Sequence, residues 1–403
     1  MHRFLYQHIP IEMRLLLTYS DIDPHQWQSL VERSPYATWF QTPEAYRFYA
    51  SVHNEMTPFV YAVAEEVKGE RLEAKGTDNQ CEIESVKCKG TENGETNIPA
   101  SRLIASSPYR LKAVSVGYVT KERSALKQFF TRRAIIIGGP LLAEDASDAE
   151  VAALLKAVKE CKVESLKCKG TEDSIAEIPV STPIYIETRN FHDYSKWRHV
   201  FEQCGFTYQP HLNFHVDTTS VEVVDKNLGK SRKRDIRTTI RDGVTPVLKP
   251  TIEQVREYYA ILKELYTTKV KTPLFSLHFF EQLYHTENGR FILTEYQGKI
   301  IGGTVCVVLP NKAVYEWFVC GVDGVYEHIF PSSYATYLGI RYAAENGCQI
   351  FDMMGAGKPE EAYGVRDFKA RFGGEQVEHG RYLCVRRPLF YQIGKMGVKI
   401  LKR

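Results

Sequence analysis

The stretch Ser332-Ser-Tyr-Ala-Thr-Tyr-Leu-Gly-Ile-Arg-Tyr-Ala-Ala-Glu-Asn346, followed by Gln349-Ile-Phe-Asp352, predicts a helix that leads into a short apolar strand. Three predicted strands precede this helix, at residues 290–296, 300–309 and 313–319. The segment Glu295-Tyr-Gln-Gly-Lys-Ile-Ile-Gly-Gly303 joins the first two as a hairpin. Strands and helices in this order are typical of α/β proteins.

The same order of elements occurs in the first half of the chain. Its helices are predicted within 25–50 and at 148–161 and 194–204, and its strands at 58–65, 111–119, 133–140, 184–188 and 208–216. In the second half, helices at 225–241, 252–267 and 277–284 precede the three strands. A chain of 403 residues also exceeds what one hydrophobic core usually organises. We therefore predict an α/β fold of two similar domains.

We predict an N-terminal domain over residues 1–215 and a C-terminal domain over 216–380. A basic amphipathic segment, 381–403, follows and is expected to pack back on the N-terminal domain. Its apolar residues recur at helical spacing: Phe390, Ile393, Met396 and Ile400. Because lysines lie between them, weak contact with an anionic membrane surface is the alternative.

Composition excludes several classes of protein. A net charge of +3 does not support binding of polyanions by bulk charge, so no DNA partner is expected. The start Met1-His-Arg-Phe-Leu-Tyr-Gln-His8 lacks a secretory core, and no apolar run is long enough to span a bilayer. We expect a cytoplasmic protein, with a peripheral position at the inner membrane face as the alternative. Nine cysteines, an odd number, indicate reduced thiols.

One literal repeat stands out: Cys81-Glu-Ile-Glu-Ser-Val-Lys-Cys-Lys-Gly-Thr-Glu92 recurs as Cys161-Lys-Val-Glu-Ser-Leu-Lys-Cys-Lys-Gly-Thr-Glu172. A metal site built from two Cys-x6-Cys pairs is one interpretation, but the spacing matches no common zinc site and no histidine accompanies it. The preferred interpretation is duplicated polar insertions, near 67–109 and 162–181, in surface loops that tolerate added length. No metal ligand is predicted.

The first candidate site is a cationic helix within 226–241. Its cations share one arc at helical spacing: Lys230, Lys233, Arg234, Arg237 and Arg241. Ile236 and Ile240 flank that arc and are expected to face the core. Such a stripe could hold a diphosphate, a nucleotide or an RNA backbone. A solvated charged face is the alternative.

The second candidate is the glycine-rich turn after the last apolar strand, Gln349-Ile-Phe-Asp-Met-Met-Gly-Ala-Gly-Lys-Pro359. Loops at the carboxyl ends of strands commonly bind ligands in α/β proteins. Asp352 is a candidate base for the proton of an attacking amine, or simply a loop cap. Lys358 is expected to contact substrate. The turn lacks the spacing of a phosphate-binding P-loop.

The third candidate is Tyr363-Gly-Val-Arg-Asp-Phe-Lys-Ala-Arg-Phe-Gly-Gly374, which gathers three cations near two aromatic rings. Acyl transfer develops negative charge on a carbonyl oxygen, and a fixed cation in a dry pocket stabilises that charge. Lys369, beside Phe368, is the leading residue for this role, with Tyr363 and Arg366 contacting substrate. Alternatively, the lysine is solvated and the phenylalanines belong to the core. Because no serine or cysteine nucleophile elbow and no His-Glu-x-x-His set occurs, we expect direct attack.

Three stretches together resemble the FemABX-like aminoacyltransferases of the GNAT superfamily and their BioF2-like acetyltransferase relatives. The first is Leu228-Gly-Lys-Ser-Arg-Lys-Arg-Asp-Ile-Arg-Thr-Thr-Ile-Arg-Asp-Gly-Val244. The second runs from Pro331 to Asp352, and the third is Gly364-Val-Arg-Asp-Phe-Lys-Ala-Arg-Phe-Gly-Gly374. With Trp39-Phe-Gln-Thr-Pro43 the resemblance spans nearly the whole chain.

This resemblance implies two tandem GNAT-like acyl-CoA N-acyltransferase domains and transfer of an aminoacyl group to an amine of a peptidoglycan precursor. It places the family's Phe-Lys pair on Phe368 and Lys369, and a phosphate-binding position near Lys271. The tRNA-binding coiled-coil arm and the usual acyl-CoA loop are both missing. The donor is therefore either aminoacyl-tRNA or acyl-CoA, with no bound cofactor. A non-catalytic tandem module that binds RNA or an anionic glycolipid is the rival.

Overall fold

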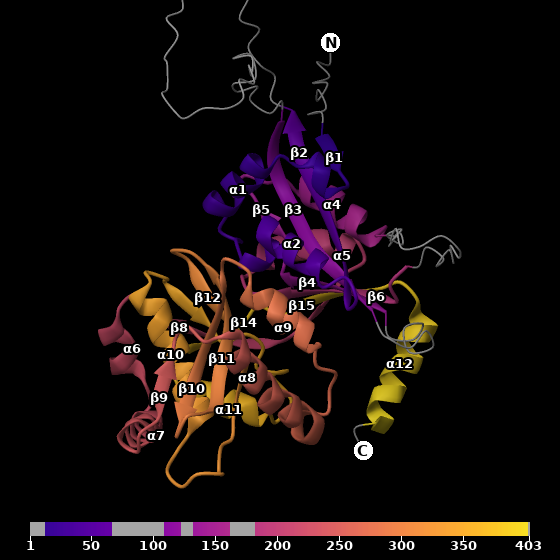
Figure 1. The fold of residues 1–403 in the computed structure, drawn as a ribbon. Coiled ribbons are helices and arrows are strands. Elements are labelled where there is room, and N and C mark those ends of the chain that lie inside the picture. Colours follow the sequence, from indigo (N-terminus) through magenta and orange to yellow (C-terminus); the bar gives the residue numbers. More distant parts are fainter. Residues whose placement is uncertain (1–12, 67–108, 122–131, 162–181, 402–403) are drawn as a thin grey trace, which may run out of the picture.

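A computed structural model describes residues 13–66, 109–121, 132–161 and 182–401, with side chains through Met396. Two mixed sheets with flanking helices form two bodies that meet near the middle of Figure 1. The first sheet is mainly indigo to magenta, with β15 at the yellow end of the scale, and the second is mainly orange. The predicted α/β fold of two domains is confirmed. The predicted repeat insertions lie outside the described residues, apart from Cys161, which is buried.

The first sheet has the strand order β1-β2-β3-β4-β6-β15-β7, with β5 on β3. Its strands are β1 (Met13–Leu16), β2 (Met56–Glu66), β3 (Tyr109–Thr120), β4 (Arg133–Gly138), β5 (Leu141–Leu142), β6 (Tyr185–Asn190), β7 (Thr207–Gln209) and β15 (Arg381–Val385). Neighbours are antiparallel except β4 and β6, which are parallel. Its helices are α1 (Pro24–Arg33), α2 (Pro43–Ser51), α4 (Asp148–Lys159) and α5 (Arg198–Gln203), with short turns η1 (Tyr19–Asp21), η2 (Trp39–Gln41) and η4 (Ser195–Trp197).

Local sequence explains where these helices begin. At α4, the Ser147 hydroxyl accepts a hydrogen bond from the backbone N–H of Glu150, and the Glu150 carboxylate accepts one from the Ser147 N–H. This reciprocal capping satisfies two donors that a helix start leaves open. At α2, Thr42 caps the helix and Pro43 occupies its first turn, as the sequence predicted.

The second sheet has the order β14-β8-β13-β12-β11-β10-β9. Its strands are β8 (Leu212–Asp217), β9 (Thr245–Val247), β10 (Gly289–Tyr296), β11 (Lys299–Leu309), β12 (Ala313–Gly321), β13 (Ile350–Asp352) and β14 (Glu375–Glu378). The helices are α6 (Val221–Asn227), α7 (Lys230–Arg241), α8 (Ile252–Leu265), α9 (Leu277–Tyr284), α10 (Pro331–Glu345), α11 (Gly364–Ala370) and α12 (Pro388–Leu401), with a π-helical turn, η5 (Tyr266–Val270), after α8. Only β12 and β13 pair in parallel among these described strands.

The two sheets exchange strands. After β7 the chain crosses into the second sheet, where β8 lies between β13 and β14. After β14 it crosses back, and β15 lies between β6 and β7. The crossings touch, since the Gly380 N–H donates to the His211 carbonyl at 3.3 Å. We call residues 210–213 and 378–381 the seam.

At the seam, the structure differs from two predictions. The single strand expected at 208–216 is two strands in different sheets, because the chain leaves β7 at Pro210. The segment 381–403 begins as strand β15 rather than as a continuous amphipathic segment. Gly380 makes the return crossing possible. Its φ is +64°, and a Cβ there would lie 2.3 Å from the Tyr208 ring.

The helix predicted at 225–241 is also two helices. Leu228 and Gly229 have extended ψ angles of 128° and 144°, which end α6 and begin α7. The Gly229 N–H donates to the Arg371 carbonyl at 3.1 Å, and a Cβ on Gly229 would lie 2.7 Å from that oxygen. Close contact with the end of α11 therefore requires glycine at this break.

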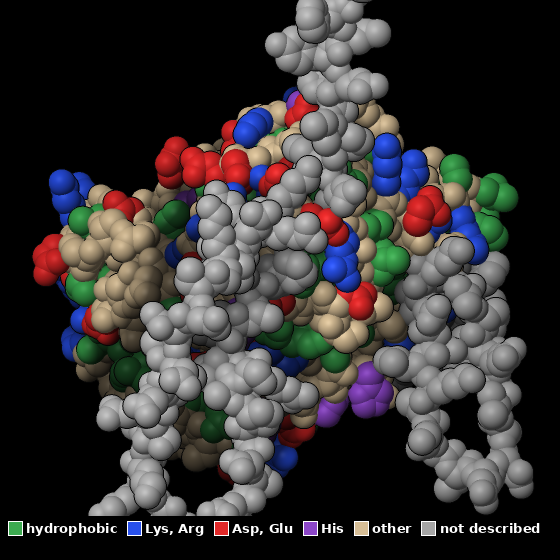
Figure 2. Space-filling view, turned by 90° about the horizontal axis from the view of Figure 1, so that it is seen from above, with side chains coloured by type: hydrophobic (Ala, Val, Ile, Leu, Met, Phe, Trp, Pro, Cys, Tyr) green, Lys and Arg blue, Asp and Glu red, His purple; other side chains and the backbone are tan. Residues whose placement is uncertain are grey.

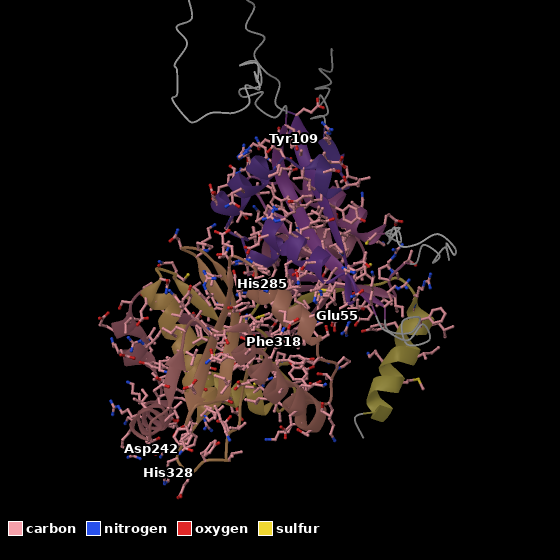
Figure 3. All side chains as sticks on the ribbon, viewed as in Figure 1. Glu55, Tyr109, Asp242, His285, Phe318 and His328 are labelled. Atoms are coloured by element: carbon pink, nitrogen blue, oxygen red, sulfur yellow. The ribbon has the colours of Figure 1, made fainter. Side chains whose placement is uncertain are left out.

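Buried residues of both domains form one continuous hydrophobic cluster, and a second cluster lies within the C-terminal domain. Aromatic rings pack between the domains: Phe40 on Trp317 and Phe48 on Phe279, each with ring centroids 5.0 Å apart. Glu55 accepts hydrogen bonds from the backbone and hydroxyl of Ser276 where the domains meet (Figure 3).

The surface mixes charges of both signs on the face seen from above (Figure 2). Among the described helices, none has the length and apolar character that crossing a membrane requires. On α12, which extends away from the body in Figure 1, the side chains of Leu389 and Met396 are 70% and 65% exposed.

Candidate active site at the end of β13

Strands β12 and β13 diverge next to the seam. Their pairing runs from Ala313 opposite Ile350 to Tyr315 opposite Asp352, while β12 continues to Gly321. The chain leaves β13 as the loop 353–359 and then enters α11. Functional side chains predicted from separate motifs meet around this loop.

Lys369 is buried, and its ammonium group binds the start of the loop. Nζ donates to the carbonyl oxygens of Met353, Met354 and Gly355, at 3.3 Å for Met354 and 2.9 Å for Gly355. Burial lowers the pKa of Lys369, whereas the carboxylates of Glu316 and Asp352 oppose that shift. The three N–H donors are therefore committed to the loop, and the cation lies at the carboxyl end of β13.

Three of the other four loop carbonyls bind Arg366, and the fourth, that of Gly357, accepts from the Leu212 N–H at 2.9 Å. The Arg366 guanidinium donates to the carbonyl oxygens of Ala356 (3.1 Å), Pro359 (3.3 Å) and Lys358. Lys358 itself is exposed and pairs with Glu361 at 3.4 Å. Arg366 thus holds the loop in place, so its predicted contact with substrate would require giving up these bonds.

Asp352 is 2% exposed and both of its oxygens have partners. Oδ1 accepts from Asn213 Nδ2 at 2.8 Å and from the Met354 N–H at 2.6 Å, and Oδ2 lies 3.2 Å from His215 Nε2. Burial acts to raise the pKa of Asp352, but His215 and these hydrogen bonds lower it. The carboxylate is therefore charged and already occupied.

His215 is the partly accessible member of this pair, with its side chain 18% exposed. It lies opposite Asp352 in the β8–β13 register. Although burial acts to lower the pKa of His215, the Asp352 carboxylate raises it above the ordinary 6.5. The Nε2 atom of the ring faces Asp352. The other ring nitrogen, Nδ1, has no hydrogen-bond partner among the described residues. Such a carboxylate–imidazole pair suits proton transfer.

Two residues of this centre were missed by the sequence analysis, although the signal was present. Asn213 and His215 alternate with apolar residues along a predicted strand, so both lie on one face. Glu316, buried in β12, gave no such signal, because it lies among aromatic and apolar neighbours. Burial raises its pKa.

Phe368 points away from this centre, toward α7. The Arg232 guanidinium lies 4.5 Å from the Phe368 ring centroid and 5.1 Å from that of Phe372. Arg232 is buried and also binds Asp235 at 3.2 Å and Ser333 at 2.8 Å. Phe368 therefore joins α11 to α7, and its role is packing rather than contact with the Lys369 ammonium.

The cationic helix α7 is exposed along its predicted arc, at Lys230, Arg234, Arg237 and Arg241. The prediction that Ile240 faces the core is wrong, since its side chain is 48% exposed. The inward stripe instead consists of Arg232, Asp235, Ile236 and Thr239, at helical spacing. Polar groups can fill this stripe because Arg232 and Asp235 neutralise each other.

We expect Arg232→Ala to lower the free energy of unfolding by about 3–5 kcal/mol, because the buried Asp235 carboxylate loses its buried partner and keeps only the exposed Arg234. Arg234→Ala is the matched control. Arg234 also pairs with Asp235, but its side chain is 75% exposed, and we expect a change within about 1 kcal/mol. Urea denaturation of both variants measures the difference, and equal effects would contradict the burial of Arg232.

Two predicted substrate contacts lie on the surface nearby. Tyr363 is 44% exposed. Lys271, also exposed, ends the π-helical turn with φ at +54°. Burial raises the pKa of Tyr266 in that turn to about 12, and Tyr363 adds to the effect, so the turn lies near Tyr363. Among the described residues, no contact joins Lys271 or the α7 arc to Lys369.

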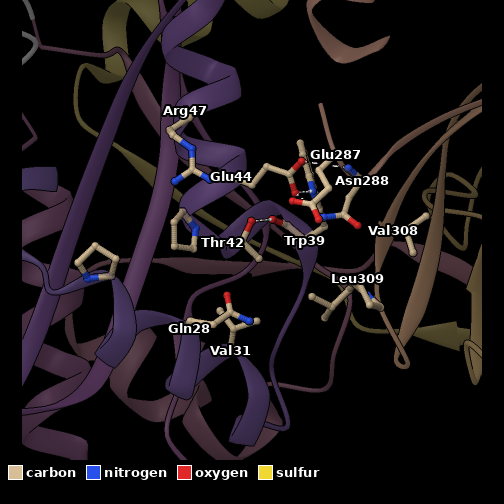
Figure 4. Close-up of a pocket in the computed structure, with 13 residues that line it drawn as sticks. Gln28, Val31, Trp39, Thr42, Glu44, Arg47, Glu287, Asn288, Val308 and Leu309 are labelled. Atoms are coloured by element: carbon tan, nitrogen blue, oxygen red, sulfur yellow. Dashed lines mark hydrogen bonds between the residues drawn. The ribbon is translucent and has the colours of Figure 1, made fainter. Parts of the chain in front are cut away.

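A separate groove of about 440 Å³ lies between α1, α2 and the end of β11 (Figure 4). Its central carboxylate, Glu44, accepts from the Asn288 N–H and Nδ2 at 3.0 and 2.7 Å and from Trp39 Nε1 at 2.8 Å. These bonds link the domains, so Glu44 is a structural bridge.

Comparison with known proteins identifies a domain that contains Asp352 and Lys369 but not His215. Residues 229–369 match the model of the acetyltransferase (GNAT) domain. The GNAT domain thus spans α7 to Lys369, and it supports acyl transfer as the class of reaction and transferase as the class of enzyme.

Solved structures extend the likeness to the whole chain. The crystal structure of FemX is similar at a TM-score of 0.59 and 12% identity, covering 92% of this chain and 98% of that one. A tandem GNAT protein from the clavulanic acid biosynthesis pathway gives 0.45 and 10%, covering 92% and 98%. L-PGS from Bacillus licheniformis gives 0.45 and 14%, covering 70% and 85%. No curated protein matches significantly. The expected FemABX-like GNAT fold is confirmed.

Proposed function

We propose that this chain is an N-acyltransferase of FemABX type, which transfers an aminoacyl or acyl group to an amine of a cell-envelope or peptidoglycan precursor. The observation that carries the proposal is the centre at the end of β13 in the GNAT domain. A buried cation, Lys369, and an Asp352–His215 pair flank the same loop there.

In this reaction the acceptor amine attacks the carbonyl carbon of the donor ester or thioester. A C–N bond forms, and the C–O bond of aminoacyl-tRNA or the C–S bond of acyl-CoA breaks. His215 takes the proton from the amine and returns one to the leaving oxygen or sulfur. Asp352 keeps the imidazole oriented, so the proton-accepting role predicted for Asp352 passes to its partner.

Lys369 acts through its charge on the oxyanion that develops at the carbonyl. Its bonds to the loop fix the ammonium group before substrate arrives, so no reorganisation is needed during the reaction. The exposed cations Lys230, Arg234, Arg237 and Lys271 are assigned to the phosphates of donor or acceptor. A lipid-linked acceptor would place the enzyme at the inner face of the membrane.

Transfer assays with isotope-labelled donors test this proposal. Purified protein, an amine-bearing precursor and either labelled aminoacyl-tRNA or labelled acyl-CoA are incubated together. We expect label to enter the acceptor from one donor class. Transfer from neither donor would contradict the proposal.

The rival function is a non-catalytic module that binds RNA or an anionic glycolipid, favoured by the exposure of the α7 cations. It predicts salt-sensitive binding that charge reversal at Arg234 and Arg237 abolishes and that Lys369 does not affect. The enzyme instead predicts that product formation is lost when Lys369 is replaced, so dependence on Lys369 separates the two functions.

A further inference from the structure

A second cavity, of about 80 Å³, lies at the seam beside the proposed centre. Its wall is formed by Arg189 and Arg381, by His211 and Asn213, and by the loop residues Met354 and Gly355. A buried water needs about 10–15 Å³, so the cavity has room for a small polar group. Two residues of its wall also contact the proposed centre. Asn213 donates a hydrogen bond to Asp352, and the Gly355 carbonyl accepts one from Lys369.

The cavity is positively charged. Glu187 binds both arginines, accepting from Arg381 Nη1 at 2.6 Å and from Arg189 Nη2 at 3.3 Å. Arg381 Nη2 lies 2.7 Å from His211 Nε2. Burial and the neighbouring Arg381 lower the pKa of His211 to about 3, so this ring is neutral at pH 7. Two arginines and one glutamate leave a net charge of +1.

The arginines also have unused donors. The Nε atoms of Arg189 and Arg381 are buried and have no hydrogen-bond partner among the described residues. Buried donors are normally paired, and leaving one unpaired is unfavourable. The arginine side chains are 33% and 27% exposed, so parts of them other than the buried Nε atoms are open to a ligand.

A carboxylate matches these features better than a phosphate monoester. One negative charge neutralises the net charge of +1, and a planar carboxylate accepts hydrogen bonds from guanidinium groups in parallel. A phosphate monoester carries about 1.5–2 negative charges at pH 7 and would leave an excess.

We propose that the seam cavity binds a carboxylate of the amine substrate. The conclusion that this carboxylate belongs to the acceptor rests on the proposed function. The conclusion that the cavity binds a carboxylate does not. Asn213, in the cavity wall, lies two residues before His215, about 7 Å along a strand. A chain of two extended residues spans this distance and a single α-amino acid does not. A ligand that carries its amine and its carboxylate two residues apart is therefore the probe for this site.

Calorimetric titration of the full chain with dialanine and with dialanine amide tests the proposal. We expect dialanine to bind, and its amide to bind about 10- to 100-fold more weakly, as loss of a charged hydrogen bond predicts. Inorganic phosphate serves as the third probe and is expected to bind more weakly than dialanine. Equal binding of acid and amide, no binding of dialanine, or tighter binding of phosphate would overturn it.

Three variants locate the binding. Arg381→Gln removes a guanidinium. Gly355→Ala fills the cavity without changing charge, because the new Cβ would lie 3.0 Å from His211 Nε2 and 3.7 Å from Arg381 Nη2. Arg386→Gln, outside the cavity, is the control. We expect the first two to weaken dialanine binding about tenfold or more and the control to leave it unchanged.

If Arg381→Gln fails to fold, Gly355→Ala still decides the question, and unchanged binding in it overturns the site. Binding without transfer would refute the proposed function and leave the carboxylate site standing. Transfer to acid and amide acceptors at equal efficiency would refute the site and leave the function standing.

Discussion

Replacement of Lys369 by methionine is expected to abolish acyl transfer and to lower the free energy of unfolding by about 3–5 kcal/mol. Methionine preserves length and apolar volume but removes the ammonium group. The carbonyl oxygens of Met353, Met354 and Gly355 then lose their donor. Glu316 and Asp352 lose the nearby positive charge as well. Urea denaturation and the transfer assay measure the two effects.

Lys358→Met is the matched control, because this lysine lies on the same loop but is exposed. We expect its stability to stay within about 1 kcal/mol of the wild type. A stable Lys369→Met protein that transfers at the wild-type rate would remove the lysine from the mechanism. A protein that is folded but inactive would separate the catalytic role from the structural one.

His215→Asn is expected to reduce the rate of transfer by about 10²–10⁴-fold, the usual contribution of a general base. The neutral imidazole is the base, so the wild-type rate should rise with pH through the pKa of His215, which lies above 6.5. Asp352→Asn removes the charge that raises this pKa, so the rising limb should move to lower pH. The pH dependence of kcat/KM measures both effects.

His199→Asn is the control for this series, since His199 is an exposed histidine on α5 paired with Asp148 at 2.7 Å. It should leave the pH profile unchanged. If kcat/KM still rises with pH in His215→Asn, the base is another group. The same conclusion follows if the rise in Asp352→Asn stays at the wild-type pH.

The sequence predicted most helices and strands. It did not predict that the chain crosses into the second sheet at β8 and returns to the first sheet at β15. Helix α9 was predicted at its observed bounds, and α10 and β13 within one residue, because each has a clear apolar period and flanking turns. The strand exchange could not be predicted, because it depends on pairing between residues that are far apart in the sequence. Arg381 on β15, for example, lies opposite Arg189 on β6. Local pattern indicates that a segment is a strand and contains no information on which sheet receives it.

The candidate site was predicted in part for the same reason. Lys369 and Asp352 lie in two neighbouring motifs, and each was identified from the chemistry of its own motif. His215 reaches Asp352 only through the seam, across 137 positions of sequence. Arg232 was overlooked because charged helix residues are usually solvated, and its burial depends on Asp235, Ser333 and two aromatic rings that other elements supply.

The central claim is that the GNAT domain transfers an acyl group to an amine of an envelope precursor at the Lys369 and His215 centre. Mass spectrometry of envelope precursors tests it most directly, in cells that carry the wild-type chain, the His215→Asn chain or no copy. The claim predicts a precursor with one added aminoacyl or acyl mass in the wild type only, with unmodified precursor in the other two. Identical precursor masses in all three, with the protein expressed and folded, would contradict it.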